Sequence, residues 1–267
     1  MFFVITFIIG MSAGKFLNFI AGRTLKGESF TRLRASSSSC KRHLSKIKWI
    51  PILSHFLIKC DCVKCADQTL IRVLLVEIVS GLLFVATYIQ HGFGAEFIIL
   101  SAAISLLLLI AIIDLKYGLI PDHILFPAII VLLFLSPFWT VLGLDRPLMG
   151  NYGALFSLAN SLCSGAGAFL AFLAVSLLYP QGIGGGDVKM AGLLGLLLGF
   201  PYIILALWIS VFVGGSIASW LLLSGRRERG DTIPFGPCLS LGALTTLLAG
   251  DYLVSVYENL IMLASRT

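Results

Sequence analysis

The apolar run AEFIILSAAISLLLLIAII at residues 95–113 ends at Asp114, in the stretch IIDLKYGLIPD of residues 112–122. A helix needs about 20 mostly apolar residues to cross the hydrocarbon core of a bilayer, so this run predicts a transmembrane helix. A carboxylate at the end of such a run is costly and is usually kept for a function. Asp114 therefore marks a membrane boundary and is a candidate functional residue.

The composition of the whole chain agrees with this local signal. Of the 267 residues, 58% are hydrophobic and only 12% are charged, and the mean hydropathy is +1.00. So few polar residues cannot cover the surface of a soluble globule. The fold class is an all-α polytopic membrane protein, and the apolar runs predict eight transmembrane helices near residues 1–21, 70–89, 95–113, 124–143, 154–179, 188–200, 202–224 and 236–262.

These helices divide the chain into three parts. Residues 1–21 form a first transmembrane helix, which we interpret as a retained span because it has no basic n-region and no cleavage site. Residues 22–69 form a polar loop domain, and residues 70–267 form a seven-helix membrane core. The helix at 188–200 is short and rich in glycine, so we expect it to be tilted, broken or packed deep inside the bundle.

The basic residues predict the orientation. Lys and Arg gather between residues 23 and 64, at Lys116 and at 226–229, whereas the opposite loop and tail hold only Arg146 and Arg266. Because basic loops stay in the cytoplasm, we expect the 22–69 loop there and both termini outside. The net charge of +6 is then a topology signal with anionic lipid as a secondary contact, and it calls for no nucleic-acid partner.

A second carboxylate, Asp187, follows Gly184, Gly185 and Gly186 and precedes the apolar run at 188–200. The predicted topology brings Asp187 and Asp114 to the same membrane face. Two adjacent carboxyl groups do not ionise together readily, so such a pair shares a proton and supplies one acid and one base. The three glycines allow close approach of a substrate strand and offer backbone N–H donors.

Three residues around the pair are candidate supporting residues. Pro121 ends or redirects the segment that follows Asp114. Asp122 is either a rival member of the pair or, as we favour, the cap of a helix that begins at Ile124. Lys189, like Lys116, either tunes the pair or marks the membrane boundary, and we favour the boundary.

The polar loop carries a separate pattern. Cys40 and His43, then Cys62 and Cys65, have the spacing of tetrahedral zinc ligands, with Cys60 as a rival for Cys62. A loop of this size has no room for a core, so a structural Cys3His zinc site would hold it together. The alternative is a set of free cytosolic thiols with a surface histidine.

Taken together, these motifs resemble the type IV prepilin peptidases, membrane aspartyl proteases with a GxGD motif. The resemblance is carried by Asp114 with Ile120-Pro121-Asp122, by Gly184 to Met190, and by blocks at 14–18, 50–54, 75–81 and 233–237 in the same order. It departs at His43, where the family usually has a cysteine.

The resemblance implies a concrete activity. Family members cut the basic leader from type IV prepilins or pseudopilins, in pilus or type II secretion systems, at the cytoplasmic face of the bacterial inner membrane. Many then methylate the new N-terminus with S-adenosylmethionine. The alternatives are a proton-coupled transporter that uses intramembrane carboxylates, a presenilin-like protease, and a structural scaffold with a zinc-bound loop.

The zinc prediction can be tested on the intact protein. Cys62→Ser removes one of the four predicted ligands, so we expect bound zinc to be lost and the loop to become sensitive to protease. Metal analysis of the purified protein and limited proteolysis measure both effects. An unchanged zinc content would refute the ligand assignment.

Overall fold

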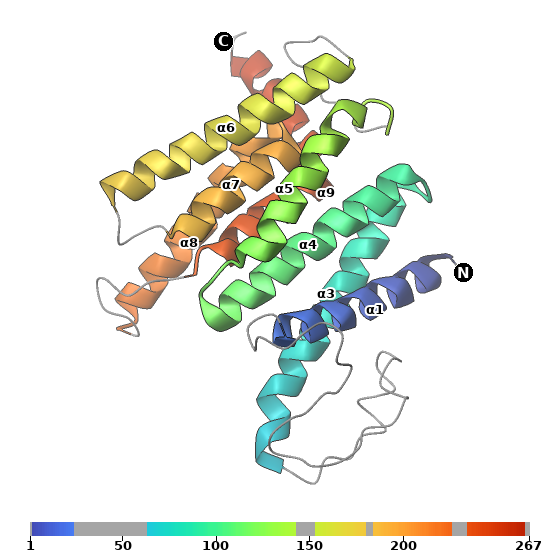
Figure 1. Ribbon diagram of the computed structural model, residues 1–267, viewed down its shortest axis with the longest axis vertical. Coiled ribbons are helices and arrows are strands. Elements are labelled where there is room, and N and C mark those ends of the chain that lie inside the picture. Colours follow the sequence, from blue (N-terminus) through green and yellow to red (C-terminus); the bar gives the residue numbers. More distant parts are fainter. Residues whose placement is uncertain (1, 24–62, 143–152, 180–183, 226–233, 265–267) are drawn as a thin grey trace. The chain divides into compact units, whose positions relative to one another are not determined.

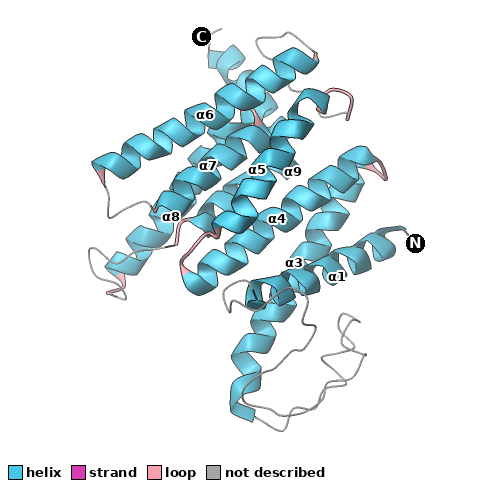
Figure 2. Cartoon of the chain, in the orientation of Figure 1, coloured by secondary structure: helices cyan, strands magenta, loops and turns pink. Residues whose placement is uncertain are grey.

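The computed structural model describes residues 2–23, 63–142, 153–179, 184–225 and 234–264, and within these ranges all regular structure is helical (Figure 2). The described residues contain eight α-helices (Figure 1). Their bounds are α1 Phe2–Arg23, α3 Val63–His91, α4 Ala95–Tyr117, α5 Asp122–Leu135, α6 Ala154–Leu178, α7 Gly185–Leu198, α8 Tyr202–Leu223 and α9 Gly236–Ala264; a short 3-10 turn, η2, Ser136–Phe138, follows α5.

Six of these helices are long and apolar enough to cross a membrane: α1, α3, α4, α6, α8 and α9. The chain is therefore a multi-pass membrane protein. The helices α5 and α7 have 14 residues each, less than one full crossing. Each of the eight predicted runs contains a helix, but a count of eight full crossings remains a prediction.

Two helix boundaries differ from the expected spans by seven residues or more. The predicted span 124–143 ends earlier, at Leu135, because Pro137 cannot continue an α-helix and the chain tightens into η2. The span predicted from residue 70 begins as a helix at Val63. The expected span rests on hydropathy, which detects only the apolar part of a helix. It therefore misses the more polar first residues of α3.

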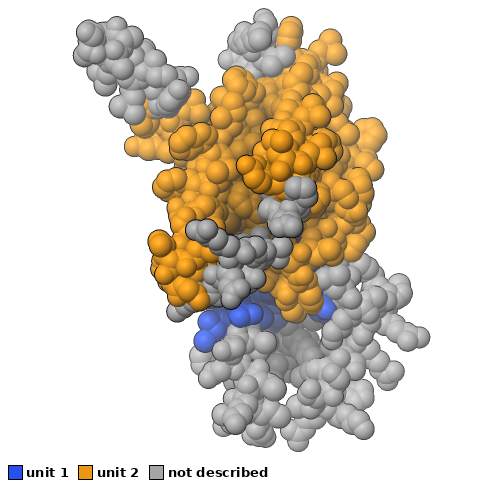
Figure 3. Space-filling view, turned by 90° about the vertical axis from the view of Figure 1, so that its left-hand side faces the viewer, with its two compact units in different colours: residues 1–112 blue, residues 113–267 orange. Residues whose placement is uncertain are grey.

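The helices form two compact units, residues 1–112 and residues 113–267 (Figure 3). In the first unit α1 packs closely on α3, since a Cβ atom at Gly10 would lie 2.8 Å from the Gly81 Cα atom. The Ser80 hydroxyl donates a hydrogen bond to the Gly10 carbonyl oxygen across this contact, at 2.8 Å. Small residues of this kind allow close helix packing in membranes.

The second unit is built around α7, which packs against α6 and also contacts α5, α8 and α9. Nearly every residue from Asp187 to Leu198 is buried, and from Met190 to Leu198 the helix is apolar all round, as interior helices are. Of the three alternatives expected for this glycine-rich segment (tilted, broken or packed deep inside), its burial supports the last. The last turn of α4, with Asp114, belongs to this same unit.

Close packing of α6 on α7 depends on Gly195. A Cβ atom there would lie 2.6 Å from the Gly165 Cα atom and would meet the Ser164 carbonyl oxygen. We expect Gly195→Ala to destabilise the protein by about 1–3 kcal/mol through overpacking, seen as a lower unfolding midpoint in detergent. The matched control is Gly167→Ala on α6, where an added Cβ meets no atom within 4 Å. Equal midpoints for the two variants would contradict this account of the α6 and α7 contact.

Candidate active site

Asp114 lies in the last turn of α4, and its side chain is buried with 5% exposure. The helix ends just after it, because the Gly118 N–H donates to the Asp114 carbonyl oxygen and Gly118 has φ +63°, a conformation suited to glycine. The Asp114 carboxyl oxygen Oδ2 accepts a hydrogen bond from the Gly236 backbone N–H, at 3.0 Å. Asp114 is thus held between the end of α4 and the beginning of α9.

Asp187 lies in the first turn of α7 and is 9% exposed. Its Oδ2 atom accepts a hydrogen bond from the Gly184 N–H at 3.2 Å, while its own N–H donates to the Gly184 carbonyl oxygen at 3.0 Å. The bond from the Gly184 N–H to the Asp187 carboxylate is one of the two hydrogen bonds of a capping box. Glycine has no side chain to make the other. Each of the two aspartates therefore receives a backbone N–H from a glycine at the beginning of a helix.

The two carboxyl groups act on each other. Asp187 lies outside the six candidate spans, and burial raises its pKa to about 6, with the Asp114 charge acting in the same direction and the Gly184 hydrogen bond opposing it. Both carboxyl groups also interact electrostatically with the Cys238 thiol in the first turn of α9. The structure thus brings Asp114 and Asp187 together within the second unit, where α4, α7 and α9 meet.

The segment between α4 and α5 lies against the beginning of α7. A Cβ atom at Gly186 would be 3.1 Å from the Ile120 Cβ atom, whereas Gly185 has open space around it. Pro121 has extended backbone angles, φ −76° and ψ 125°, and directs the chain into α5. The predicted roles of Gly185 and Gly186 toward a substrate remain predictions.

Asp122 does not cap a helix. The helix α5 begins at Asp122 itself after Pro121, and no side-chain capping hydrogen bond forms there. The prediction that Asp122 caps a helix starting at Ile124 is wrong, because α5 begins two residues earlier and Pro121 occupies the capping position. Instead, both Asp122 carboxylate oxygens accept hydrogen bonds from the Lys189 ammonium, at 2.7 and 2.8 Å.

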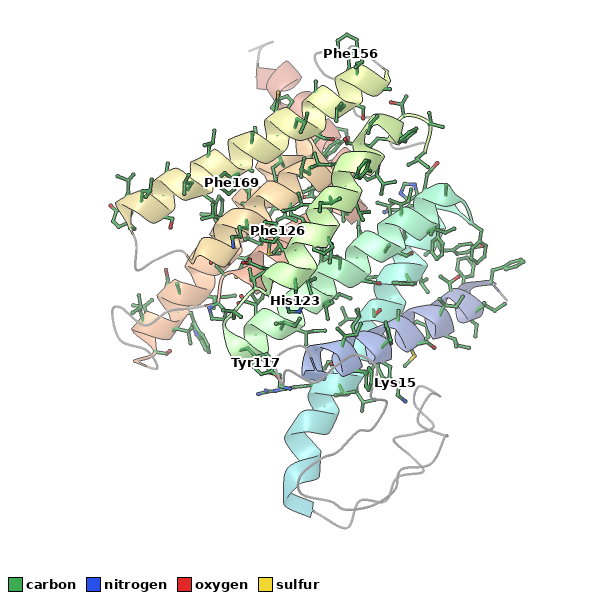
Figure 4. All side chains as sticks on the ribbon, viewed as in Figure 1. Lys15, Tyr117, His123, Phe126, Phe156 and Phe169 are labelled. Atoms are coloured by element: carbon green, nitrogen blue, oxygen red, sulfur yellow. The ribbon has the colours of Figure 1, made fainter. Side chains whose placement is uncertain are left out.

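Lys189 joins two helices through this contact. Its ammonium pairs with Asp122 on α5 and lies 5.4 Å from the ring centre of Phe126, which is labelled on α5 in Figure 4. The side chains of Lys189 and Asp122 are 36% and 54% exposed, and exposed pairs of this kind contribute about 0.2–1 kcal/mol. Lys116 lies over the Tyr117 ring at 5.0 Å.

The predicted zinc ligands lie largely outside the described residues. Cys40, His43 and Cys62 fall in the range that the structure does not describe, and Cys65 is placed only as a backbone position in the first turn of α3. In the ranges that are described, no group of three His, Cys, Asp or Glu side chains is arranged to hold a metal. The zinc site therefore stays a prediction.

One residue of the site does not emerge from the sequence as a candidate. Gly236 belongs to the segment Pro234-Phe235-Gly236-Pro237, which stands out in the sequence only as a block shared with a family. Its N–H contact with Asp114 joins positions 122 residues apart. The glycine and its flanking prolines indicate an unusual backbone conformation in the sequence. They do not indicate which side chain accepts a hydrogen bond from that backbone.

Comparisons with known proteins agree with the motifs. Residues 101–219 match the model of the Type IV leader peptidase family, and residues 8–91 match that of the Bacterial Peptidase A24 N-terminal domain. The prepilin leader peptidase/N-methyltransferase of Bacillus subtilis (strain 168) is 32% identical over 254 residues, covering 95% of this chain and 96% of the relative.

Two further relatives have the same name. The protein of Pseudomonas aeruginosa is 27% identical, with 96% of this chain and 93% of the relative aligned, and that of Legionella pneumophila is 28% identical, with 84% and 75% aligned. No solved structure shows significant similarity to the chain. The ordered motifs, the helical membrane core and these matches together show that the chain belongs to the type IV leader peptidase family.

Proposed function

We propose that this protein is a membrane aspartic endopeptidase that removes the leader peptide of type IV prepilins or pseudopilins, with Asp114 and Asp187 as its catalytic pair. The observation that carries the proposal is the meeting of two buried, electrostatically coupled carboxyl groups in one unit of a leader peptidase family member. The relatives named above are prepilin leader peptidases. Their shared name gives the substrate class.

The proposed mechanism of peptide hydrolysis requires that the two carboxyl groups share one proton. The ionised carboxylate takes a proton from water as the water oxygen bonds to the scissile carbonyl carbon, and the protonated carboxyl group donates a hydrogen bond to the developing oxyanion. The tetrahedral intermediate then collapses, the C–N bond breaks, and the departing amine receives a proton from the pair. Because the two groups titrate as a unit, we assign the acid and base roles to the pair.

The position of the pair suits a substrate that is itself partly in the membrane. Asp114 follows an apolar helix and Asp187 precedes one, so the cut falls where an apolar substrate helix meets its polar leader. Basic residues gather on the same predicted side. We therefore place the active site at the cytoplasmic face of the bacterial inner membrane.

The second activity concerns the N-terminus that cleavage creates. The relatives are named N-methyltransferases as well as peptidases, and we propose that this chain methylates the new amine, with S-adenosylmethionine supplying the methyl group. We assign no binding residues to that donor. The three thiols and one imidazole predicted in the 22–69 loop suit structural zinc, which would hold this loop together.

The other functions that we considered lack a supporting observation. A proton-coupled transporter would use membrane carboxylates, but the match to the leader peptidase family over residues 101–219 argues against it. The family also disfavours a scaffold without enzymatic activity, because a scaffold has no use for a pair of buried carboxyl groups.

Conservative removal of either carboxyl group tests the catalytic pair. We expect Asp114→Asn and Asp187→Asn each to lower prepilin cleavage in membranes by at least about 100-fold, since an amide can act as neither acid nor base. Mass spectrometry of the processed N-terminus measures the cut position and any added methyl group in one spectrum.

The matched control is Glu96→Gln, which removes a carboxylate from the other unit, where Glu96 pairs with His91; its cleavage should equal that of the wild type. Insertion and protein amount are compared for all variants. Cleavage at the wild-type rate in either asparagine variant would exclude that residue from the pair, and loss in Asp122→Asn would bring Asp122 back as a rival.

A further inference from the structure

The contact between Gly236 and Asp114 combines a hydrogen bond with a steric limit. The Gly236 N–H donates to Asp114 Oδ2 at 3.0 Å, in buried surroundings. A Cβ atom on Gly236 would lie 2.6 Å from that same oxygen and 3.1 Å from the carboxyl carbon. No amino acid other than glycine therefore fits this position while the carboxyl group stays where it is.

The location of Gly236 in its helix explains why its N–H is available. Gly236 is the first residue of α9, and the first N–H groups of a helix have no acceptor within the helix. The next residue, Pro237, has no N–H to offer. The Asp114 carboxyl group thus acts as the acceptor for the beginning of α9, and the positive end of the helix favours a carboxylate there.

The preceding residue anchors this segment in the second unit. The Phe235 ring packs against Gly214 of α8, where an added Cβ atom would lie 2.6 Å from Phe235 Cε2. It also lies 6.1 Å, centre to centre, from the Phe172 ring on α6. The Phe235 carbonyl oxygen accepts the Leu239 N–H at 3.0 Å, which fixes the first turn of α9.

We propose that Gly236 is a positioning residue for proteolysis: its backbone N–H orients the Asp114 carboxyl group, and its missing side chain leaves the space that this group occupies. The proposal rests on the proposed peptidase function. It adds a residue from the last helix to a site otherwise built from the ends of α4 and α7.

Kinetics of Gly236→Ala separate positioning from substrate binding. The added methyl group must displace the Asp114 carboxyl group, and a displacement of about 1 Å costs up to roughly 100-fold in rate. We expect kcat for prepilin cleavage to fall by about 10- to 100-fold while KM stays within about twofold of the wild type. The matched control is Gly215→Ala on α8, where a Cβ atom meets nothing within 4 Å; its kcat and KM should both be unchanged.

A stability cycle tests the contact without any cleavage. Gly236→Ala should lower the unfolding midpoint in detergent when Asp114 is present. Its effect should be smaller in Asp114→Ala, where the carboxyl group is gone and only the Cβ atom, 3.2 Å from an added Cβ at Gly236, remains. If Gly236→Ala yields too little protein for unfolding, the amount of protein in membranes is compared instead among the wild type, the two single variants and the double variant. Equal effects of Gly236→Ala in both backgrounds, or a wild-type kcat in Gly236→Ala, would overturn the proposal. Cleavage that survives in Asp114→Asn would instead overturn the proposed function, whatever the cycle shows.

Discussion

Two carboxyl groups are withdrawn from water in the second unit, and each has a backbone N–H as its hydrogen-bond donor. Asp114 is bound by Gly236 and Asp187 by Gly184. At Asp187, burial disfavours the charged form of the carboxyl group and the hydrogen bond from Gly184 favours it, so the two effects oppose each other. Two adjacent carboxyl groups withdrawn from water can keep one proton between them, which is the condition that the proposed acid and base catalysis requires.

This arrangement depends on a helix that is too short to be an ordinary span. The helix α7 is buried along nearly its whole length, and it packs closely on α6 because glycine occupies positions 165 and 195. The first turn of α7 is therefore held in place by packing within the unit. Asp187 lies in that turn and is buried. A full-length span with a lipid-facing side would have fewer packing contacts to prevent sliding and tilting than this interior helix, and would hold a carboxyl group less firmly.

The sequence identifies a candidate functional residue most clearly where a charged side chain stands beside a long apolar run. Asp114 and Asp187 stand at the ends of apolar runs, and this position alone makes both of them candidate functional residues. The cap predicted at Asp122 is wrong because its partner, Lys189, lies 67 residues away, and pairing across helices leaves no local pattern. Gly236 escapes sequence reasoning for a related cause, since a backbone donor has the same chemistry in every residue and only its position in the fold gives it a role.

The ion pair between Lys189 and Asp122 bears on the proposed sharing of a proton by Asp114 and Asp187. Lys189 follows Asp187 by two residues, and a cation beside two carboxyl groups would favour ionisation of both and oppose the proton sharing that we propose. The structure directs the Lys189 ammonium to Asp122 on α5, with both oxygens within 2.8 Å. Asp114 and Asp187 are instead held by uncharged backbone N–H groups, which orient the carboxyl groups and favour their ionisation less strongly than a cation would. A weak, half-exposed ion pair that contributes little to stability can in this way matter to the proton balance of the site.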